Sequence, residues 1–134
     1  MKKMSMAVLL VLFVFTGFAF AQDLVGKWVT IGSSWGARDG ESDHGKLTGE
    51  SWTGMGMIMT LEIEKQNGRA FHGKWCSQHE CEDLVGVIKS NGEIRMADHD
   101  GHFEASMIGD RMEVCYIEAD GKHRIAVCRF MEKE

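Results

Sequence analysis

Four pairs of turn-forming residues divide the second half of the chain at near-regular spacing: Asn91-Gly92, Asp100-Gly101, Gly109-Asp110 and Asp120-Gly121. Asn-Gly and Asp-Gly favour tight hairpins because both residues tolerate a positive φ. The segments between these pairs are rich in apolar residues and have the length of single strands. Residues 84–131 are therefore predicted to form a β-meander.

The same organisation extends upstream of residue 84. Met57, Met59, Leu61 and Ile63 alternate with polar residues, which is the pattern of a half-buried strand. After the turn at Asn67-Gly68 the chain returns with three residues on one face, and the central one is a glycine that predicts a bulge or a bend. These three are Phe71, Gly73 and Trp75.

Eight strands and no helix are expected in the mature chain. Their predicted ranges are 24–31, 55–66, 69–77, 83–90, 93–98, 102–108, 111–119 and 123–131. Consecutive hairpins with alternating faces favour an all-β fold, an eight-stranded antiparallel up-and-down β-barrel, since closure removes the exposed edges. A two-sheet sandwich is the alternative.

The first 21 residues have the pattern of a cleaved signal peptide. A basic start at Lys2-Lys3 precedes a short apolar run that ends in Ala19-Phe20-Ala21. The run is shorter than the ~20 residues that a membrane-spanning helix needs, so an uncleaved anchor is the less favoured reading. We expect an exported protein, periplasmic or extracellular, with one domain over residues 22–134 and no membrane association once the signal is removed.

The charge of the mature chain indicates which partners to expect. Removal of Lys2 and Lys3 moves the formal net charge from −5 to −7. Nucleic-acid binders usually carry a basic patch, so no nucleic-acid partner is expected. The oligomeric state is left open.

All four cysteines lie in the mature part, and an even count in an exported chain predicts two disulfides. Cys76 and Cys81 flank a four-residue hairpin tip. If residues 120–123 form a four-residue loop, Cys115 faces Cys128 across an antiparallel pair, which is close enough to bridge. A loop shorter by one residue would break this register.

Gly26-Lys27-Trp28 on the first strand resembles the Gly-x-Trp signature of the calycins, the barrels that include lipocalins, fatty-acid-binding proteins and avidins. The resemblance implies that Trp28 packs across one barrel end under a basic residue of a late strand, and Arg129 is the expected partner. The length of the mature chain is nearer that of the avidin-like barrels. The residues that form the biotin site of avidins have no counterpart here, so biotin binding is not carried over.

Residues 32–54 are rich in glycine and serine, and we expect a long loop over the barrel mouth, or a loop that contains a short irregular strand. Aromatic side chains on such a loop can close over a ligand. Trp35, Trp52 and the adjacent Ser34 are the predicted ligand-binding residues. The competing interpretation is that both tryptophans cap the barrel as ordinary core.

Three further clusters contain metal-ligating residue types, and each has a simpler explanation. Asp39, Glu41, Asp43 and Glu50 have the carboxylate spacing of a calcium loop, but the glycine is one residue late and no flanking helix is expected. His72, Cys76, His79 and Cys81 could offer zinc ligands, although exported cysteines favour a disulfide. The stretch from Asp98 to His102 reads as a polar turn. We predict no metal and no cofactor.

The sequence contains no catalytic motif, and no enzymatic activity is expected. The favoured hypothesis is an exported module that binds a small apolar or aromatic ligand at the barrel mouth. The alternative is a protein-interaction module, such as a secreted enzyme inhibitor, that uses the loop of residues 32–54. A barrel that binds a ligand should keep a cavity of at least ~300 Å³.

Overall fold

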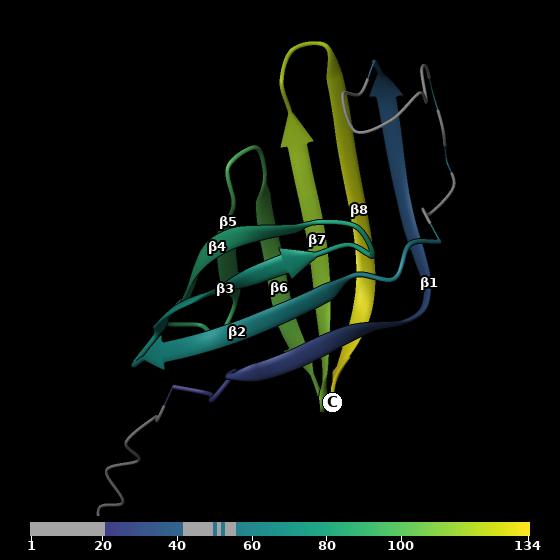
Figure 1. Cartoon of the computed structure of the whole chain (residues 1–134). Coiled ribbons are helices and arrows are strands. Elements are labelled where there is room, and N and C mark those ends of the chain that lie inside the picture. Colours follow the sequence, from purple (N-terminus) through teal and green to yellow (C-terminus); the bar gives the residue numbers. More distant parts are fainter. Residues whose placement is uncertain (1–20, 42–49, 51, 53–55) are drawn as a thin grey trace, which may run out of the picture.

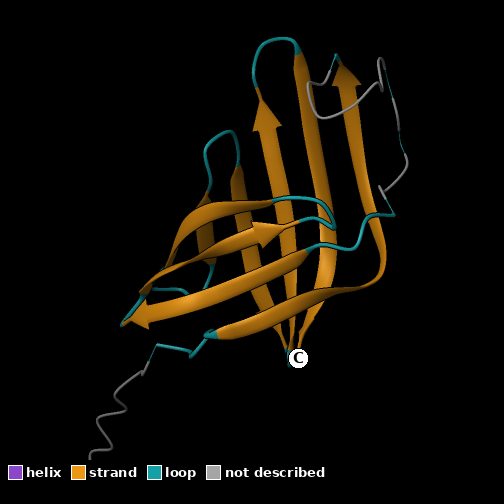
Figure 2. Cartoon of the chain, in the orientation of Figure 1, coloured by secondary structure: helices purple, strands orange, loops and turns teal. Residues whose placement is uncertain are grey.

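The computed structural model describes residues 21–41, 50, 52 and 56–134 (Figures 1 and 2). Alternating apolar residues and glycine turns give eight strands in this part of the chain, and the strands close into a barrel. Each strand pairs antiparallel with the next one in sequence, and β1 pairs with β8 to close the barrel. The predicted up-and-down β-barrel is confirmed. The strands are β1 (Gly26–Gly40), β2 (Thr60–Asn67), β3 (Ala70–Cys76), β4 (Cys81–Ile88), β5 (Ile94–Ala97), β6 (His102–Ile108), β7 (Arg111–Ala119) and β8 (His123–Lys133).

The barrel interior is filled by every second residue of the strands. Leu61 and Ile63 on β2, and Phe71 and Trp75 on β3, are buried as their alternation predicts. Apolar side chains from the remaining strands complete the core: Leu84, Ile88, Ile94, Met96, Phe103, Ala105, Met112, Val114, Val127 and Met131.

The first strand is longer than expected, because the first part of residues 32–54 is not a loop but an irregular continuation of β1, nearer the alternative of a short irregular strand. β1 continues to Gly40 because residues 35–40 pair with residues 123–128 of β8. The ladder shifts register between Ile31 and Trp35, where Gly32 adopts a φ of 63°. This bulge bends β1, so its second half runs with β7 and β8 beyond the other strands (Figure 1). β2, in turn, starts at Thr60 rather than near residue 55.

Gly73 lies at the predicted irregularity. The β2–β3 ladder shifts register between Ile63 and Lys65, and Gly73 pairs with Ile63. A Cβ atom on Gly73 would lie 2.1 Å from the Glu62 carbonyl oxygen. Glycine therefore permits the close approach of the two backbones at this bend.

The end of the barrel next to the C-terminus is covered by the residues that lead into β1. Leu24 and Trp28 are buried there, and the Trp28 Nε1–H donates to the Leu24 carbonyl at 3.0 Å. Gln66 fastens this segment by accepting from the Leu24 N–H at 2.9 Å and donating to the Gln22 carbonyl at 2.8 Å.

A basic residue of the last strand does lie over Trp28, but it is not Arg129. The Lys133 ammonium is 5.7 Å from the Trp28 ring centre, whereas the Arg129 guanidinium lies over Trp75. Register explains the correction, since Trp28 pairs with Lys133. Arg129 is four residues back along the same inward-facing side of β8, roughly 13 Å away along the strand.

Both disulfides form as predicted. Cys76 and Cys81 bridge at the β3–β4 turn, and Cys115 and Cys128 bridge across β7 and β8. The register that the second bridge needs is present, with Ala119 opposite Arg124 and Cys115 opposite Cys128.

The predicted signal peptide lies outside the described residues except for Ala21. Within the described part of the chain, no helix is long and apolar enough to span a membrane.

Candidate functional site

At the end of the barrel opposite the C-terminus, the described residues form a cleft of about 610 Å³, which we call the mouth cleft. In an up-and-down barrel, the odd-numbered connections all lie at one end. The β3–β4, β5–β6 and β7–β8 turns therefore meet the residues that lead into β2 at this opening. The volume is in the range of small-molecule sites, which start near ~300 Å³. Apolar side chains of the cleft wall are Met57, Ile58, Met59, Trp75, Ile125 and Val127.

A row of three aromatic rings lies beneath and beside the cleft. The Trp75 and Phe103 ring centres are 4.9 Å apart, and those of Phe103 and Tyr116 are also 4.9 Å apart. Both contacts are tilted or edge-on, the arrangement that aromatic pairs prefer. The rings are supplied by β3, β6 and β7, so they give the cleft a rigid floor.

Arg129 is the buried cation of the mouth cleft. It is 2% exposed, its guanidinium carbon is 5.5 Å from the Trp75 ring centre, and its Nη1 donates to the Met57 carbonyl at 3.2 Å. Burial lowers its pKa to about 10. Among the described residues, no carboxylate lies within ion-pair distance of Arg129. Guanidinium groups in proteins are usually matched by planar anions, and the described residues offer Arg129 none.

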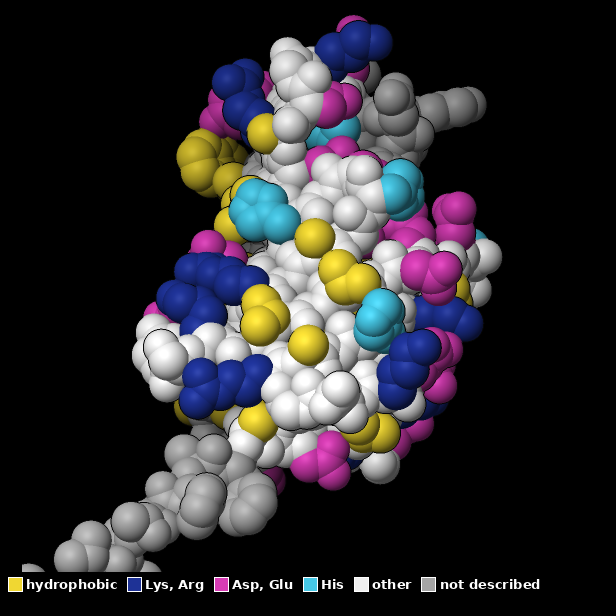
Figure 3. All heavy atoms as spheres, turned by 90° about the vertical axis from the view of Figure 1, so that its left-hand side faces the viewer, with side chains coloured by type: hydrophobic (Ala, Val, Ile, Leu, Met, Phe, Trp, Pro, Cys, Tyr) yellow, Lys and Arg dark blue, Asp and Glu magenta, His cyan; other side chains and the backbone are white. Residues whose placement is uncertain are grey.

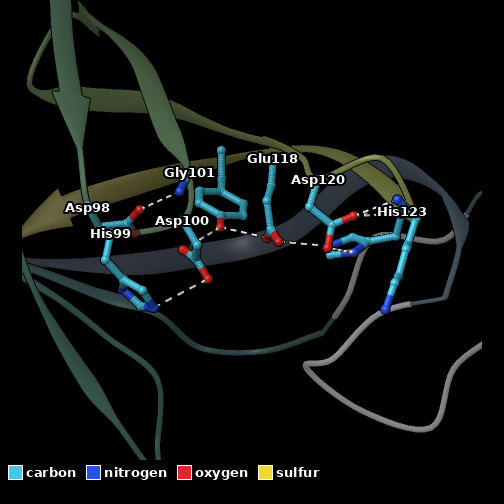
Figure 4. Close-up of polar contacts among 9 residues, drawn as sticks. Asp98, His99, Asp100, Gly101, Glu118, Asp120 and His123 are labelled. Carbon is cyan, nitrogen blue, oxygen red and sulfur yellow. Dashed lines mark hydrogen bonds and ion pairs between the residues drawn. The ribbon is translucent and has the colours of Figure 1, made fainter.

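Polar side chains form a row along the β7 side of the opening (Figure 4). The Tyr116 hydroxyl lies 2.7 Å from Glu118 Oε2 and 3.2 Å from Asp100 Oδ1, so it donates to one carboxylate at a time. Burial, followed by the hydrogen bond to Glu118, raises the pKa of Tyr116 far above its ordinary value. Tyr116 therefore stays a neutral donor at physiological pH.

His123 continues the row and is 4% exposed. Its Nε2 is 2.7 Å from Glu118 and its Nδ1 is 3.2 Å from Asp120, although neither contact is well directed for a hydrogen bond. Asp120 also accepts from the backbone N–H groups of His123 and Lys122, and these two bonds lower its pKa. Each ring nitrogen of His123 thus has a carboxylate beside it, so the imidazole is held as a structural part of the β7–β8 turn.

The β4 and β5 side of the cleft is acidic. Glu82 and Asp98 line it, and burial together with the nearby carboxylates of Asp100 and Asp98 raises the pKa of Glu82. Glu82, His99 and Asp100 each place one donor atom within 4.8 Å of the others, so these three could hold a metal ion. His99 is exposed and sits 3.6 Å from both acids.

The residues that were predicted to bind a ligand do not meet at the cleft. Ser34 is half-buried at the β1 bulge. Trp35 is on β1 rather than in a loop, is 43% exposed and packs its ring 5.4 Å from that of Phe130 on the outer surface. Trp52 is 76% exposed. None of the three belongs to the cleft lining that the structure describes, so their role in binding stays a prediction.

The other expected clusters are resolved differently. The Cys76–Cys81 disulfide removes both thiolates from the zinc alternative. Asp39 lies on β1, 3.3 Å from Arg124, and residues 42–49 of the calcium-like spacing lie outside the described part. The polar turn after β5 is confirmed, since the Gly101 N–H donates to Asp98 Oδ1 at 2.8 Å.

The outer surface offers a weaker candidate. A groove of about 430 Å³ runs over β2 to β5, and its acid Glu64 is already paired with Lys74 at 3.1 Å. On the face shown in Figure 3, apolar side chains lie apart from one another among charged residues and histidines.

Sequence reasoning missed Glu82, Tyr116, Glu118 and His123, and one signal could have found most of them. On β7 and β8 every second residue faces inward. Most of these residues are apolar, but near the mouth several are polar. A polar residue at an inward position of a barrel strand marks either a lined cavity or a buried contact. Glu118, His123 and Arg129 are such residues.

Comparisons of the chain with protein-family models, with curated proteins and with solved structures found no match.

Proposed function

We propose that this protein is an exported, non-enzymatic binding module of calycin-like type, and that it holds a small amphipathic organic acid in the mouth cleft. The acidic group pairs with Arg129, and the apolar body rests on Trp75 and on the methionines that lead into β2. The observation that carries the proposal is a buried guanidinium, without a carboxylate partner among the described residues, on the wall of a mostly apolar cleft. The two disulfides and the closed eight-stranded barrel are compatible with this assignment.

The energetics support a ligand at Arg129. Taking a guanidinium out of water costs several kcal/mol unless an anion and further hydrogen bonds compensate for the loss of hydration. Here the Met57 carbonyl and the Trp75 ring offer partial compensation. An incoming carboxylate would complete it with two parallel N–H···O bonds.

The surroundings of His123 and Tyr116 favour binding over catalysis. His123 is 4% exposed and has a carboxylate near each ring nitrogen, so a substrate has little access to either nitrogen. The Tyr116 hydroxyl is likewise engaged by Glu118 and Asp100.

The test compares octanoate with octan-1-ol by isothermal titration calorimetry. Octanoate is expected to bind at least about tenfold more tightly, because only the anion forms charge-assisted hydrogen bonds with Arg129. Arg129→Met should remove this preference while the variant stays folded, and Arg129→Lys should retain part of it. Equal affinity for the two probes in the unmodified protein, or an undiminished preference in Arg129→Met, would refute the proposal.

A protein-interaction module is the second candidate, and the exposed rings of Trp35 and Trp52 favour it. Such a module would bind its partner through the outside of β1, so Trp35→Ala would weaken complex formation and leave octanoate binding unchanged.

A further inference from the structure

The mouth cleft has a second pole of opposite charge. Glu82 from β4, Asp98 from the end of β5 and Glu118 from β7 line the same cleft as Arg129, and we call these three the acidic wall. Arg129 thus shares one cavity with the acidic wall, but its described contacts are with the Met57 carbonyl and the Trp75 ring and not with these acids.

Two members of the acidic wall have acceptor capacity that the described chain does not use. Asp98 accepts from the Gly101 N–H through Oδ1, while its Oδ2 is buried and has no hydrogen-bond partner. Glu82 has the imidazole of His99 3.6 Å away. No lysine or arginine of the described part lies within ion-pair distance of either acid. A buried carboxylate oxygen without a donor is costly, and a ligand that brings a donor would remove this cost.

The two poles flank the same indole ring. Trp75 pairs with Glu82 in the β3–β4 ladder, so their side chains start about 5 Å apart. Arg129 lies over that indole from the opposite wall. Because Trp75, Glu82, Asp98 and Arg129 line one cleft, a molecule that lies along the Trp75 ring has Arg129 and the two acids within the same cavity.

We propose that the ligand of the mouth cleft is dipolar, with an anionic group on Arg129 and a protonated amine on Glu82 and Asp98. This inference rests on the proposed function and adds the second pole to it. An amine offers up to three N–H donors, which matches the free Asp98 Oδ2 and the Glu82 carboxylate. The apolar segment between the charged groups would lie on Trp75 and Tyr116.

The experiment uses three probes with one chain length: octanoate, octylammonium and 8-aminooctanoate. Calorimetric titrations are run at pH 7 in the presence of a metal chelator. We expect 8-aminooctanoate to bind about tenfold more tightly than octanoate, since it adds charge-assisted contacts to the acidic wall. A shorter series, 4-aminobutanoate and 6-aminohexanoate, should show an affinity optimum at one length, because both poles are fixed.

Variants separate the two poles. Asp98→Asn, which keeps an acceptor for the Gly101 N–H, and Glu82→Gln should each reduce the advantage of 8-aminooctanoate without weakening octanoate. Asp83→Asn is the matched control, because Asp83 is the exposed neighbour of Glu82 on β4 and does not line the cleft. It should leave all three affinities unchanged.

The outcomes distinguish this inference from the proposed function. If octanoate binds through Arg129 but 8-aminooctanoate binds no better, the dipolar ligand is refuted and the organic-acid site stands. If neither carboxylate binds, both proposals fail. Binding of 8-aminooctanoate that requires omission of the chelator would also overturn the dipolar ligand, in favour of a metal held by Glu82, His99 and Asp100.

Discussion

The guanidinium carbon of Arg129 lies 5.5 Å from the ring centre of Trp75, on the inside of the barrel and at the level where the core gives way to the mouth cleft. The Trp75 ring centre also lies 4.9 Å from that of Phe103. The indole is therefore shared between the hydrophobic core and the wall of the cleft. Substitutions of Arg129 and Trp75 should consequently have different effects on folding.

Arg129→Met is expected to leave stability unchanged or to raise it. Burial depresses the pKa of Arg129 to about 10, so the folded state disfavours its charge. Because a base with a depressed pKa destabilises the fold at every pH below that pKa, the gain should persist from neutral pH up to about 10. Trp75→Ala removes core contacts and should cost about 3–5 kcal/mol. Urea denaturation of both variants measures the difference.

If Arg129→Met instead lost more than about 2 kcal/mol, the guanidinium would be a structural anchor for the Met57 backbone. The case for a ligand at Arg129 would then lose its energetic support.

Glu82→Gln should stabilise the protein at pH 7 but not in acid. Burial and the nearby carboxylates raise the pKa of Glu82. The folded state therefore binds this proton more tightly than the unfolded state, and stability falls as pH rises from the ordinary glutamate pKa through the raised one. Above that window the ionised Glu82 costs stability, and glutamine removes the cost. Below it both states are protonated, and the variant should match the parent.

Thermal melts at pH 7 and near pH 3 check this sign. A change of 1 kcal/mol moves the Tm of a domain of this size by roughly 4–8 °C, so a fraction of that is measurable. Asp83→Asn is the control on the outer face of the same strand. A lower Tm for Glu82→Gln at pH 7 would mean that the Glu82 charge is compensated within the chain.

Most of the fold was predictable because it depends on signals that are local in sequence. The glycine turns locate five of the seven sequential connections, and an assumed four-residue loop at residues 120–123 gives the Cys115–Cys128 register. The error in β1 has a non-local cause. Residues 32–40 have little apolar alternation, and they are extended because β8 offers them a free edge more than eighty positions later in the chain.

The candidate site was less predictable for the same reason. The hairpin pattern places Asp98, Asp100 and Glu118 near the mouth, but the approach of Tyr116 to Asp100 and of His99 to Glu82 joins residues of different strands and turns, 16 and 17 positions apart. The prediction for Trp28 failed by four residues along β8, since Arg129 and Lys133 share a face and only strand pairing distinguishes them.

Gly73→Ala should destabilise the barrel by about 1–3 kcal/mol, the usual cost of overpacking. Its Cβ would meet the Glu62 carbonyl oxygen at 2.1 Å and the Glu62 carbonyl carbon at 3.1 Å, and these backbone atoms cannot rotate away. Gly56→Ala is the control, because no described residue lies within 4 Å of its Cβ position. Equal urea midpoints for the two variants would show that the β2 bulge is not constrained by Gly73.

The two disulfides should separate stability from ligand binding. By restricting the unfolded chain, the Cys115–Cys128 bridge should add about 3 kcal/mol to the free energy of unfolding, and the shorter Cys76–Cys81 loop about 2 kcal/mol. The Cys76–Cys81 bridge, however, holds the turn of residues 77–80, which forms part of the mouth cleft. Paired replacement of Cys76 and Cys81 by alanine is therefore expected to weaken octanoate binding, while replacement of Cys115 and Cys128 lowers the urea midpoint more and leaves affinity intact. Calorimetry below the unfolding range tests this, and equal affinity in both double variants would exclude the turn from the binding site.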